Sequence, residues 1–443
     1  MKNILNLLDW TILHDEENPH DYQFTVQYNK DTDLCMSCFT FGPVKFGVID
    51  QLIMDLPIHA KRVGLNVQRQ RYRCKNCGKT FMQAIPDVDD KRSMTGRLLR
   101  FIEKESLRRT FTSIAEDVGV TEKTIRNIFH DHIAYLEETT TFVTPEWMGI
   151  DELHLLKQPR CIVTNVKERT VVELLEKRDK TSVTNYLYTV KDRANVRVVT
   201  MDMWNPYRTA VTQLMPDAEI VVDKFHVVRM ANEAMETVRK RVRTGLTDRQ
   251  RRTLMHDRFI LLRRRSELEP RHELVLETWK ANFPLLGQAY DLKEGFMGIW
   301  DATTRAGAEY LYKEWEQRIP TELTYAFDPI TTAMKNWRRQ VFAYFEFDGA
   351  TNAYTEALNG LVKMTNRIGR GYSFEAIRAK LLYGTGLHKV RKPPYQKQWT
   401  PDVPEMGFPV DDEPVLNFGS DLSTLTRLLE IDGLDDESTL KSE

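Results

Sequence analysis

The chain has 443 residues, of which 41% are hydrophobic and 29% charged, and its formal net charge is −1. A chain of this length buries two or three hydrophobic cores, so we expect a multidomain globular protein, which the strand and helix patterns described below place in the α+β class. No run of eighteen apolar residues occurs, and the short apolar start turns acidic before any signal-peptide cleavage site, which argues against membrane and secreted classes and predicts a cytoplasmic protein.

Residues 20–85 form the first predicted domain, a β-rich unit with alternating segments such as YQFTVQY. Two CxxC pairs offer four soft ligands, which is the set that one structural Zn²⁺ requires. These ligands are Cys35, Cys38, Cys74 and Cys77. The 35 residues between the pairs exceed the usual zinc-ribbon spacing, and His59 is an alternative ligand. A redox dithiol or free thiols are the alternative interpretation, while Cys161 is predicted to be a packing residue.

Residues 93–138 show apolar spacings of three and four, which predict short helices. In the segment SIAEDVGVTEKTIRNIFHDH, Ala115 is followed four residues later by Gly119, a spacing typical of a helix-turn-helix. Thr121 would cap the second helix. The side chains predicted to face DNA are Lys123, Thr124, Arg126 and Asn127. An ordinary helical pair with a solvated polar face is the alternative.

Residues 146–230 and 345–387 form the predicted catalytic domain. Three antiparallel-capable strands, followed by alternating helices and strands, indicate a ribonuclease-H-like mixed α/β sheet. Asp151 lies in the strand WMGIDELHL, and Asp202 follows the strand VRVVTM. These strands are neighbours in such a sheet, so the two carboxylates are expected to share a metal ion, although a single strand-end Asp is usually a cap or turn residue.

A third carboxylate is expected from the segment TNAYTEALNGLVK, in which Glu356 lies on a short helix and Asp348 is the nearby alternative. The segment VVDKFHVVR follows the last predicted strand and contains two further candidates. Asp223 is a supporting residue or the alternative second carboxylate. His226 has either a supporting role at the site or a structural one.

Residues 231–344 contain long charged amphipathic segments without a convincing strand, which predict an all-helical insertion. Residues 238–265 carry eleven Lys/Arg against two acids, and residues 360–392 carry eight against one. Such stretches suit contacts with DNA phosphates, although a solvated basic face is the alternative. The candidates are Arg239, Lys240, Arg243, Lys363, Arg367 and Arg370. Residues 388–443, first Pro-rich and then acidic, form a predicted C-terminal tail.

Five stretches together resemble a bacterial insertion-sequence transposase of the ISL-three (ISL3) family, DDE class. They are the paired CxxC knuckles, GIDELH, VTMDMWNPYRTAV, AEIVVDKFHVVRMANEA and TEALNGLVKMTNRIGRGYSF. They follow the family's order as far as about residue 387. The resemblance implies that Asp151, Asp202 and Glu356 form the Asp-Asp-Glu triad, with two Mg²⁺ or Mn²⁺ ions as catalytic cofactors.

The resemblance also implies the substrate, double-stranded DNA. We expect an enzyme that binds the terminal inverted repeats of an insertion sequence, cuts at the element ends and joins them to target DNA. Water would make the first cut, and the freed 3′-hydroxyl would attack the target. Pairing two ends implies a homodimer or larger assembly at the nucleoid. A regulator without catalysis and a resolvase that cuts without joining are the rival interpretations.

Overall fold

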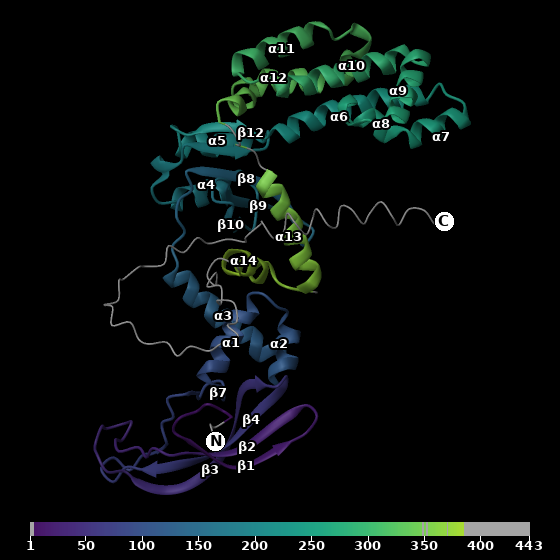
Figure 1. The fold of residues 1–443 in the computed structure, drawn as a ribbon. Helices are drawn as coiled ribbons and strands as arrows, with labels where there is room; N and C mark the ends of the chain where they lie inside the picture. Colours follow the sequence, from purple (N-terminus) through teal and green to yellow (C-terminus); the bar gives the residue numbers. More distant parts are fainter. Residues whose placement is uncertain (1–3, 348–349, 351–352, 370, 385–443) are drawn as a thin grey trace, which may run out of the picture. The chain divides into compact units, whose positions relative to one another are not determined.

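The computed structural model describes residues 4–347, 350, 353–369 and 371–384 (Figure 1). The chain divides into two compact units. The first is formed mainly by residues up to Thr141, and the second mainly by Phe142–Arg367 and Gly371–Leu382. The tail predicted for residues 388–443 lies outside the described residues. None of the described helices is both long and apolar enough to span a bilayer.

The first unit contains a seven-stranded sheet in the order β1-β2-β4-β3-β7-β6, with β5 paired to β4. Its strands are β1 (Trp10–Glu17), β2 (Asp21–Tyr28), β3 (Val44–Ile58), β4 (Lys61–Arg73), β5 (Thr80–Met82), β6 (Val88–Asp89) and β7 (Met94–Thr95). Along β4, the buried Val63, Leu65 and Val67 alternate with more exposed residues. This period of two places one face of the sheet in a core with Phe24 and Ile53.

Three helices complete the first unit: α1 (Gly96–Ser106), α2 (Phe111–Val118) and α3 (Glu122–Thr139). Each begins after a threonine whose hydroxyl accepts a hydrogen bond from the backbone N–H three residues later, at Thr95, Thr110 and Thr121. Such caps satisfy a backbone donor that the first helical turn leaves unpaired. The sequence therefore sets the start of all three helices locally.

The second unit contains a five-stranded sheet in the order β10-β9-β8-β11-β12. Its elements are β8 (Trp147–Leu155), β9 (Gln158–Asn165), β10 (Thr170–Leu175), α4 (Lys180–Thr189), the 3-10 turn η1 (Arg193–Asn195), β11 (Val198–Met201), α5 (Asn205–Leu214) and β12 (Glu219–Val222). Strands β8, β9 and β10 are antiparallel, whereas β11 is parallel to both β8 and β12. The predicted succession of strands and helices in this part of the chain is confirmed.

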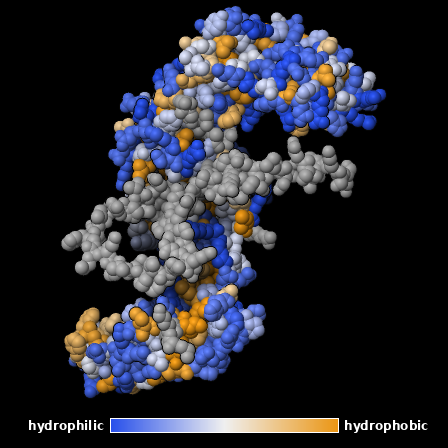
Figure 2. Space-filling view, in the orientation of Figure 1, coloured by the Kyte–Doolittle hydropathy of each residue, from blue (hydrophilic) through white to orange (hydrophobic). Residues whose placement is uncertain are grey.

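Helices and 3-10 turns, without a strand, make up the described residues between β12 and α13. They are α6 (Lys224–Arg243), α7 (Asp248–His256), α8 (Arg258–Leu262), η2 (Arg265–Glu267), α9 (Pro270–Asn282), α10 (Pro284–Gly298), η3 (Ile299–Asp301), α11 (Arg305–Gln317), η4 (Thr321–Leu323), α12 (Thr324–Phe342) and η5 (Ala343–Phe345). Their outer surface is mostly hydrophilic (Figure 2), and their core includes Phe296, Trp315 and Phe342. Helix α6 is continuous through residue 231. The predicted boundary between the catalytic domain and the helical insertion therefore falls inside a helix.

Two last helices, α13 (Ala353–Gly369) and α14 (Phe374–Tyr383), return to the five-stranded sheet of the second unit. Arg378 of α14 donates two hydrogen bonds to the carboxylate of Glu173 in β10, at 2.6 and 2.7 Å. Arg160 of β9 lies over the ring of Phe374. Residues from the end of the chain's described part therefore pack on strands that lie about 200 positions earlier.

Candidate metal centres and nucleic-acid interface

The four cysteines of the CxxC pairs lie together in the first unit. Their sulfur atoms all lie within 4.8 Å of one another, with Cys35–Cys77 at 3.8 Å and Cys38–Cys74 at 3.6 Å. Four thiolates at about 2.3 Å from one zinc ion would be separated by about 3.8 Å, so the cluster fits tetrahedral Zn²⁺. His59 instead lies in the turn between β3 and β4, 3.3 Å from the hydroxyl of Tyr22.

Each cysteine pair is shaped by a tight turn. The N–H of Cys35 donates to the carbonyl of Thr40 at 3.0 Å, and the N–H of Cys74 donates to that of Lys79 at 2.9 Å. Gly78 closes the second turn with a φ of 72°, a conformation that favours glycine. Hydrogen bonding with Thr40 lowers the pKa of Cys38 to about 6, whereas burial and the neighbouring thiols raise the pKa of Cys77 to about 11, so the first thiolate of the metal-free cluster forms at Cys38.

Helices α2 and α3 have the geometry of a helix-turn-helix. Gly119 ends α2 in the left-handed region with a φ of 74°, and the Thr121 hydroxyl accepts from the N–H of Thr124 at 3.2 Å. The apolar faces meet in the core, where the rings of Phe111 and Phe129 lie 5.1 Å apart. The predicted cap and turn are therefore confirmed.

The outer face of α3 presents the side chains predicted to contact DNA. Lys123, Arg126 and Asn127 are exposed, and Thr124 is partly buried beside the cap. Arg126 also pairs with Glu122 at 2.6 Å, so DNA contact by its guanidinium would compete with this ion pair. The DNA contacts themselves stay predictions.

Asp151 lies on β8, and Asp202 directly follows β11, the neighbouring parallel strand of the second unit. Met201 is in register with Ile150, so the residues that follow them, Asp202 and Asp151, come together. Asp151 is 3% exposed. Burial, followed by repulsion from Asp202, raises the pKa of Asp151 to about 8. The arrangement concentrates negative charge where a cation would be stabilised.

The start of α6 adds Asp223 and His226 to this carboxylate cluster. Nδ1 of His226 lies 2.9 Å from Oδ1 of Asp202 and 3.5 Å from Oδ2 of Asp223, which is fully buried. Interaction first with Asp202 and then with Asp223 raises the pKa of His226 to about 10. The imidazolium therefore offsets part of the cluster's negative charge, and a supporting role for Asp223 and His226 stays a prediction.

Helix α13 reaches the same strand through Asn359. Its Nδ2 donates to Oδ2 of Asp151 at 3.0 Å. One turn earlier, the hydroxyls of Thr355 and Thr164 lie 3.0 Å apart in the core. Glu356 lies within α13, but its side chain and Asp348 are outside the described residues. Asn359 was not among the residues predicted from the sequence; its signal was the spacing of three from Glu356, which is typical of one helix face.

A pocket of about 230 Å³ opens beside Asp202. It is lined by Glu152, Arg178, Asp202, Met203, Trp204, Tyr207, His226, Arg229 and Met230. Arg178 pairs with Glu152 and lies 4.8 Å from the centre of the Trp204 ring. The Glu152–Arg178 pair was not predicted from the sequence, because no local pattern links residues 26 positions apart.

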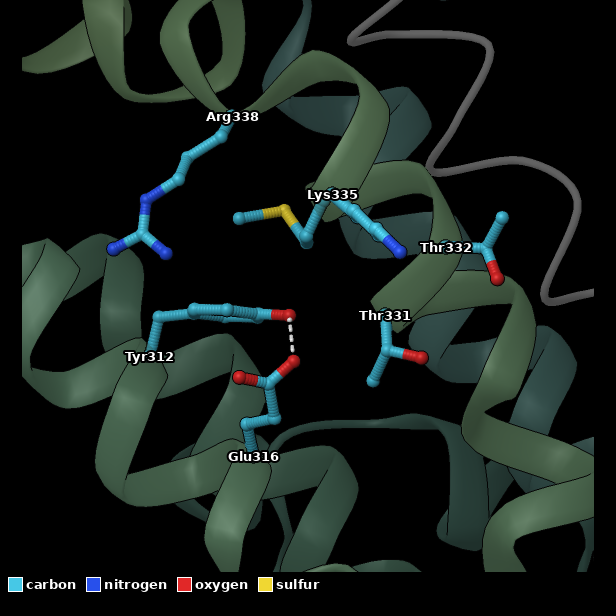
Figure 3. A pocket seen from close by; sticks show the side chains of 7 residues that line it. Tyr312, Glu316, Thr331, Thr332, Lys335 and Arg338 are labelled. Atoms are coloured by element: carbon cyan, nitrogen blue, oxygen red, sulfur yellow. Dashed lines mark hydrogen bonds between the residues drawn. The ribbon is translucent and has the colours of Figure 1, made fainter.

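A larger pocket of about 500 Å³ lies in the helical region between α11 and α12 (Figure 3). Tyr312 donates a hydrogen bond to Glu316 at 2.9 Å, and Lys335 and Arg338 line the opposite wall. It contains none of the residues predicted for catalysis or DNA contact.

The basic residues predicted to contact phosphates differ in exposure. Arg239 is 5% exposed, and its guanidinium donates two hydrogen bonds to Glu236 at 2.8 and 2.9 Å. Its guanidinium is therefore turned inward in this structure, so its predicted DNA contact would require the pair with Glu236 to open. The exposed candidates are Lys240, Arg243, Lys363 and Arg367. Arg370 lies outside the described residues.

Comparison with known families decides what these sites belong to. Residues 148–381, more than half of the chain, match the transposase model of the ISL3 type. The chain belongs to the ISL3 family of transposases. Residues 83–133 of the transposase match the helix-turn-helix domain of transposase family ISL3, and residues 33–77 match the zinc-finger of transposase IS204/IS1001/IS1096/IS1165.

A named relative supports the same assignment. The transposase is 24% identical over 328 residues to a Bordetella parapertussis protein named "Transposase for insertion sequence element IS1001". The aligned region covers 72% of this chain and 80% of the relative. The family resemblance of the sequence is thus confirmed, together with the zinc-ribbon and helix-turn-helix interpretations. Membership implies a DNA-binding enzyme that cleaves and transfers DNA.

Proposed function

We propose that this transposase binds the terminal inverted repeats of an insertion sequence, cuts DNA at the element ends and joins them to target DNA by DDE chemistry. Asp151, Asp202 and Glu356 are its proposed catalytic triad. The main support is the approach of Asp151 and Asp202 on parallel strands. Asn359, three residues after Glu356, holds α13 against the same strand.

The proposal includes a ribonuclease-H-like catalytic domain with an all-helical insertion. Three antiparallel strands followed by two parallel ones, with helices in the connections, support that fold. The helical residues lie between β12 and α13, so they separate Asp202 from Glu356 in sequence. Because α6 begins at Lys224, the insertion starts there rather than at residue 231.

The acidic cluster fits divalent metal ions of the hard type. Oδ1 of Asp202 and Oδ2 of Asp223 are buried, and Nδ1 of His226 lies 2.9 and 3.5 Å from them. Carboxylate oxygens are the ligands that suit Mg²⁺ or Mn²⁺. Two such ions, when bound, activate the attacking oxygen and stabilise the leaving oxygen. Asp223 is the alternative second carboxylate.

The protein's own groups have complementary tasks in this proposal. The zinc ribbon and the exposed face of α3 read the terminal repeats, with Lys123 and Asn127 among the contacts. Lys240 and Arg243 contact phosphates from the helical region. Pairing of two ends requires at least a homodimer when the enzyme is active.

The test is a cleavage and strand-transfer assay on paired DNA ends of the element with Mg²⁺. Glu356→Gln should abolish cutting and joining while DNA binding survives. Asp348→Asn is the matched control and should keep activity. If Asp348→Asn lost cleavage activity while Glu356→Gln kept it, Asp348 rather than Glu356 would be the third carboxylate. Cutting without joining would support a resolvase, and binding without any cutting would support a regulator.

A further inference from the structure

We propose that Asn359 is a positioning residue of the metal centre, which fixes the orientation of the Asp151 carboxylate for metal binding. This inference rests on the proposed function. Asp151 is almost fully buried, and its two oxygens have separate donors. Oδ1 accepts from the N–H of Glu152 at 2.7 Å, and Oδ2 accepts from Nδ2 of Asn359 at 3.0 Å.

Two hydrogen bonds of this kind restrict rotation of the carboxylate without using up its ligand capacity. Each carboxylate oxygen offers about two lone-pair directions, so each oxygen of Asp151 keeps one for a metal ion. Of the two donors, the backbone N–H of Glu152 is fixed by the strand. The amide of Asn359 is the donor that a side-chain substitution removes.

The register of α13 on β8 explains why Asn359 reaches Asp151. Gly149 and Asp151 lie on the same face of β8, since side chains alternate along a strand. A Cβ at Gly149 would lie 2.3 Å from the Thr164 hydroxyl and 3.1 Å from that of Thr355, so only glycine permits this approach. Thr355 and Asn359 are four residues apart on one helix face. The close packing of Thr355 against Gly149 therefore brings Asn359, one helical turn later, next to Asp151.

The other end of the Asn359 amide also indicates a metal-centre role. Its Oδ1 is buried and has no hydrogen-bond donor among the described residues. Nδ2 also lies 3.5 Å from the backbone carbonyl of Glu152, which can only accept; turning the amide over would place Oδ1 against that carbonyl, so the nitrogen faces Asp151 and Glu152. Buried polar atoms normally find a partner. A water molecule bound to a cation beside Asp151 would supply the missing hydrogen-bond donor.

The experiment measures Mn²⁺ binding by the full-length protein on element-end DNA, from the electron paramagnetic resonance signal of free Mn²⁺. Asn359→Ala should raise the Mn²⁺ Kd by about 10- to 100-fold, the usual effect of removing a group that orients a ligand. The Mg²⁺ concentration for half-maximal cleavage should rise in parallel. Asn359→Leu, which better preserves the side-chain volume, should give the same shift if the alanine variant folds poorly.

Thr355→Val is the matched control, because it removes a polar contact between α13 and Thr164 of β9 without removing a hydrogen bond to Asp151. It should lower thermal stability while changing the Mn²⁺ Kd by less than about twofold. Equal Kd shifts in Thr355→Val and Asn359→Ala, or no shift in Asn359→Ala, would overturn the positioning role. Wild-type protein that cuts DNA without a divalent metal would instead overturn the proposed function, and with it this inference.

Discussion

Each cysteine pair of the first unit lies in one short turn, whereas the carboxylate cluster of the second unit is assembled from β8, β11 and α6 and is contacted by α13. The hydrogen bond between Asn359 and Asp151 alone joins residues 208 positions apart. The cysteine site therefore depends on local turns brought together by one hairpin, and the acidic site depends on the whole sheet. A single substitution in a cysteine turn should therefore abolish zinc binding. Substitutions at the acidic site should instead reduce activity to different degrees, depending on the residue.

Removal of one zinc ligand should have the largest effect. Cys74→Ser takes away one of four ligands from a closed structural site, whose apparent zinc-binding free energy is about 10–16 kcal/mol. We expect loss of the one bound Zn²⁺ and unfolding of the first unit, measured by metal analysis and thermal unfolding. Cys161→Ala in the buried sheet core should retain the zinc. Full zinc content in Cys74→Ser would contradict a four-cysteine site.

Substitution of the second carboxylate should strongly lower DNA cleavage without unfolding the protein. Asp202→Asn removes a proposed metal ligand and should lower cleavage on the order of 10³-fold with folding intact. Asp223→Asn changes a buried carboxylate that caps α6 and contacts His226, so we expect about 10- to 100-fold. The rates are compared on one DNA end under saturating Mg²⁺. A larger loss in Asp223→Asn would make Asp223 the second carboxylate.

The Mg²⁺ concentration that cleavage requires should depend on pH, whereas zinc binding by the cysteines should not. The raised pKa of Asp151, about 8, means that a proton competes with Mg²⁺ below that pH. The Mg²⁺ concentration for half-maximal cleavage should therefore rise as pH falls from about 8 to about 6.5, by at most about tenfold per pH unit. Zinc content should stay constant over this range, because a closed site with four thiolate ligands binds zinc with an apparent free energy of about 10–16 kcal/mol at pH 7. A half-maximal Mg²⁺ concentration independent of pH would contradict this competition.

Local patterns explain which parts of the molecule could be predicted from the sequence. The continuous apolar runs of β11 and β12 predicted buried strands, and Thr121 and Gly119 predicted the turn between α2 and α3. Each of these signals lies within a few residues of the structure that it determines. The same holds for the cysteine turns, which is why the zinc site could be assigned before the fold.

Contacts between distant elements explain what could not be predicted. The role of Asn359 depends on the approach of α13 to Gly149, which only the assembled sheet defines. Arg239 belongs to a basic run, but the run does not show which residue turns inward to pair with Glu236. Charge counts therefore identified a basic segment without identifying its exposed members.

The smallest effect should come from a cap that acts locally, like the cysteine turns. Thr121→Ala removes the hydroxyl that accepts from the N–H of Thr124, which should cost about 0.5–2 kcal/mol of unfolding free energy. Urea unfolding of the zinc-bound protein measures it, and Thr110→Ala, which removes the equivalent cap of α2, is the comparison. Zinc content and the Mg²⁺ dependence of cleavage should be unchanged, because neither site contains this residue. A shift in the Mg²⁺ dependence would show that the acidic site responds to a local change in the first unit, and the contrast between the two sites would fail.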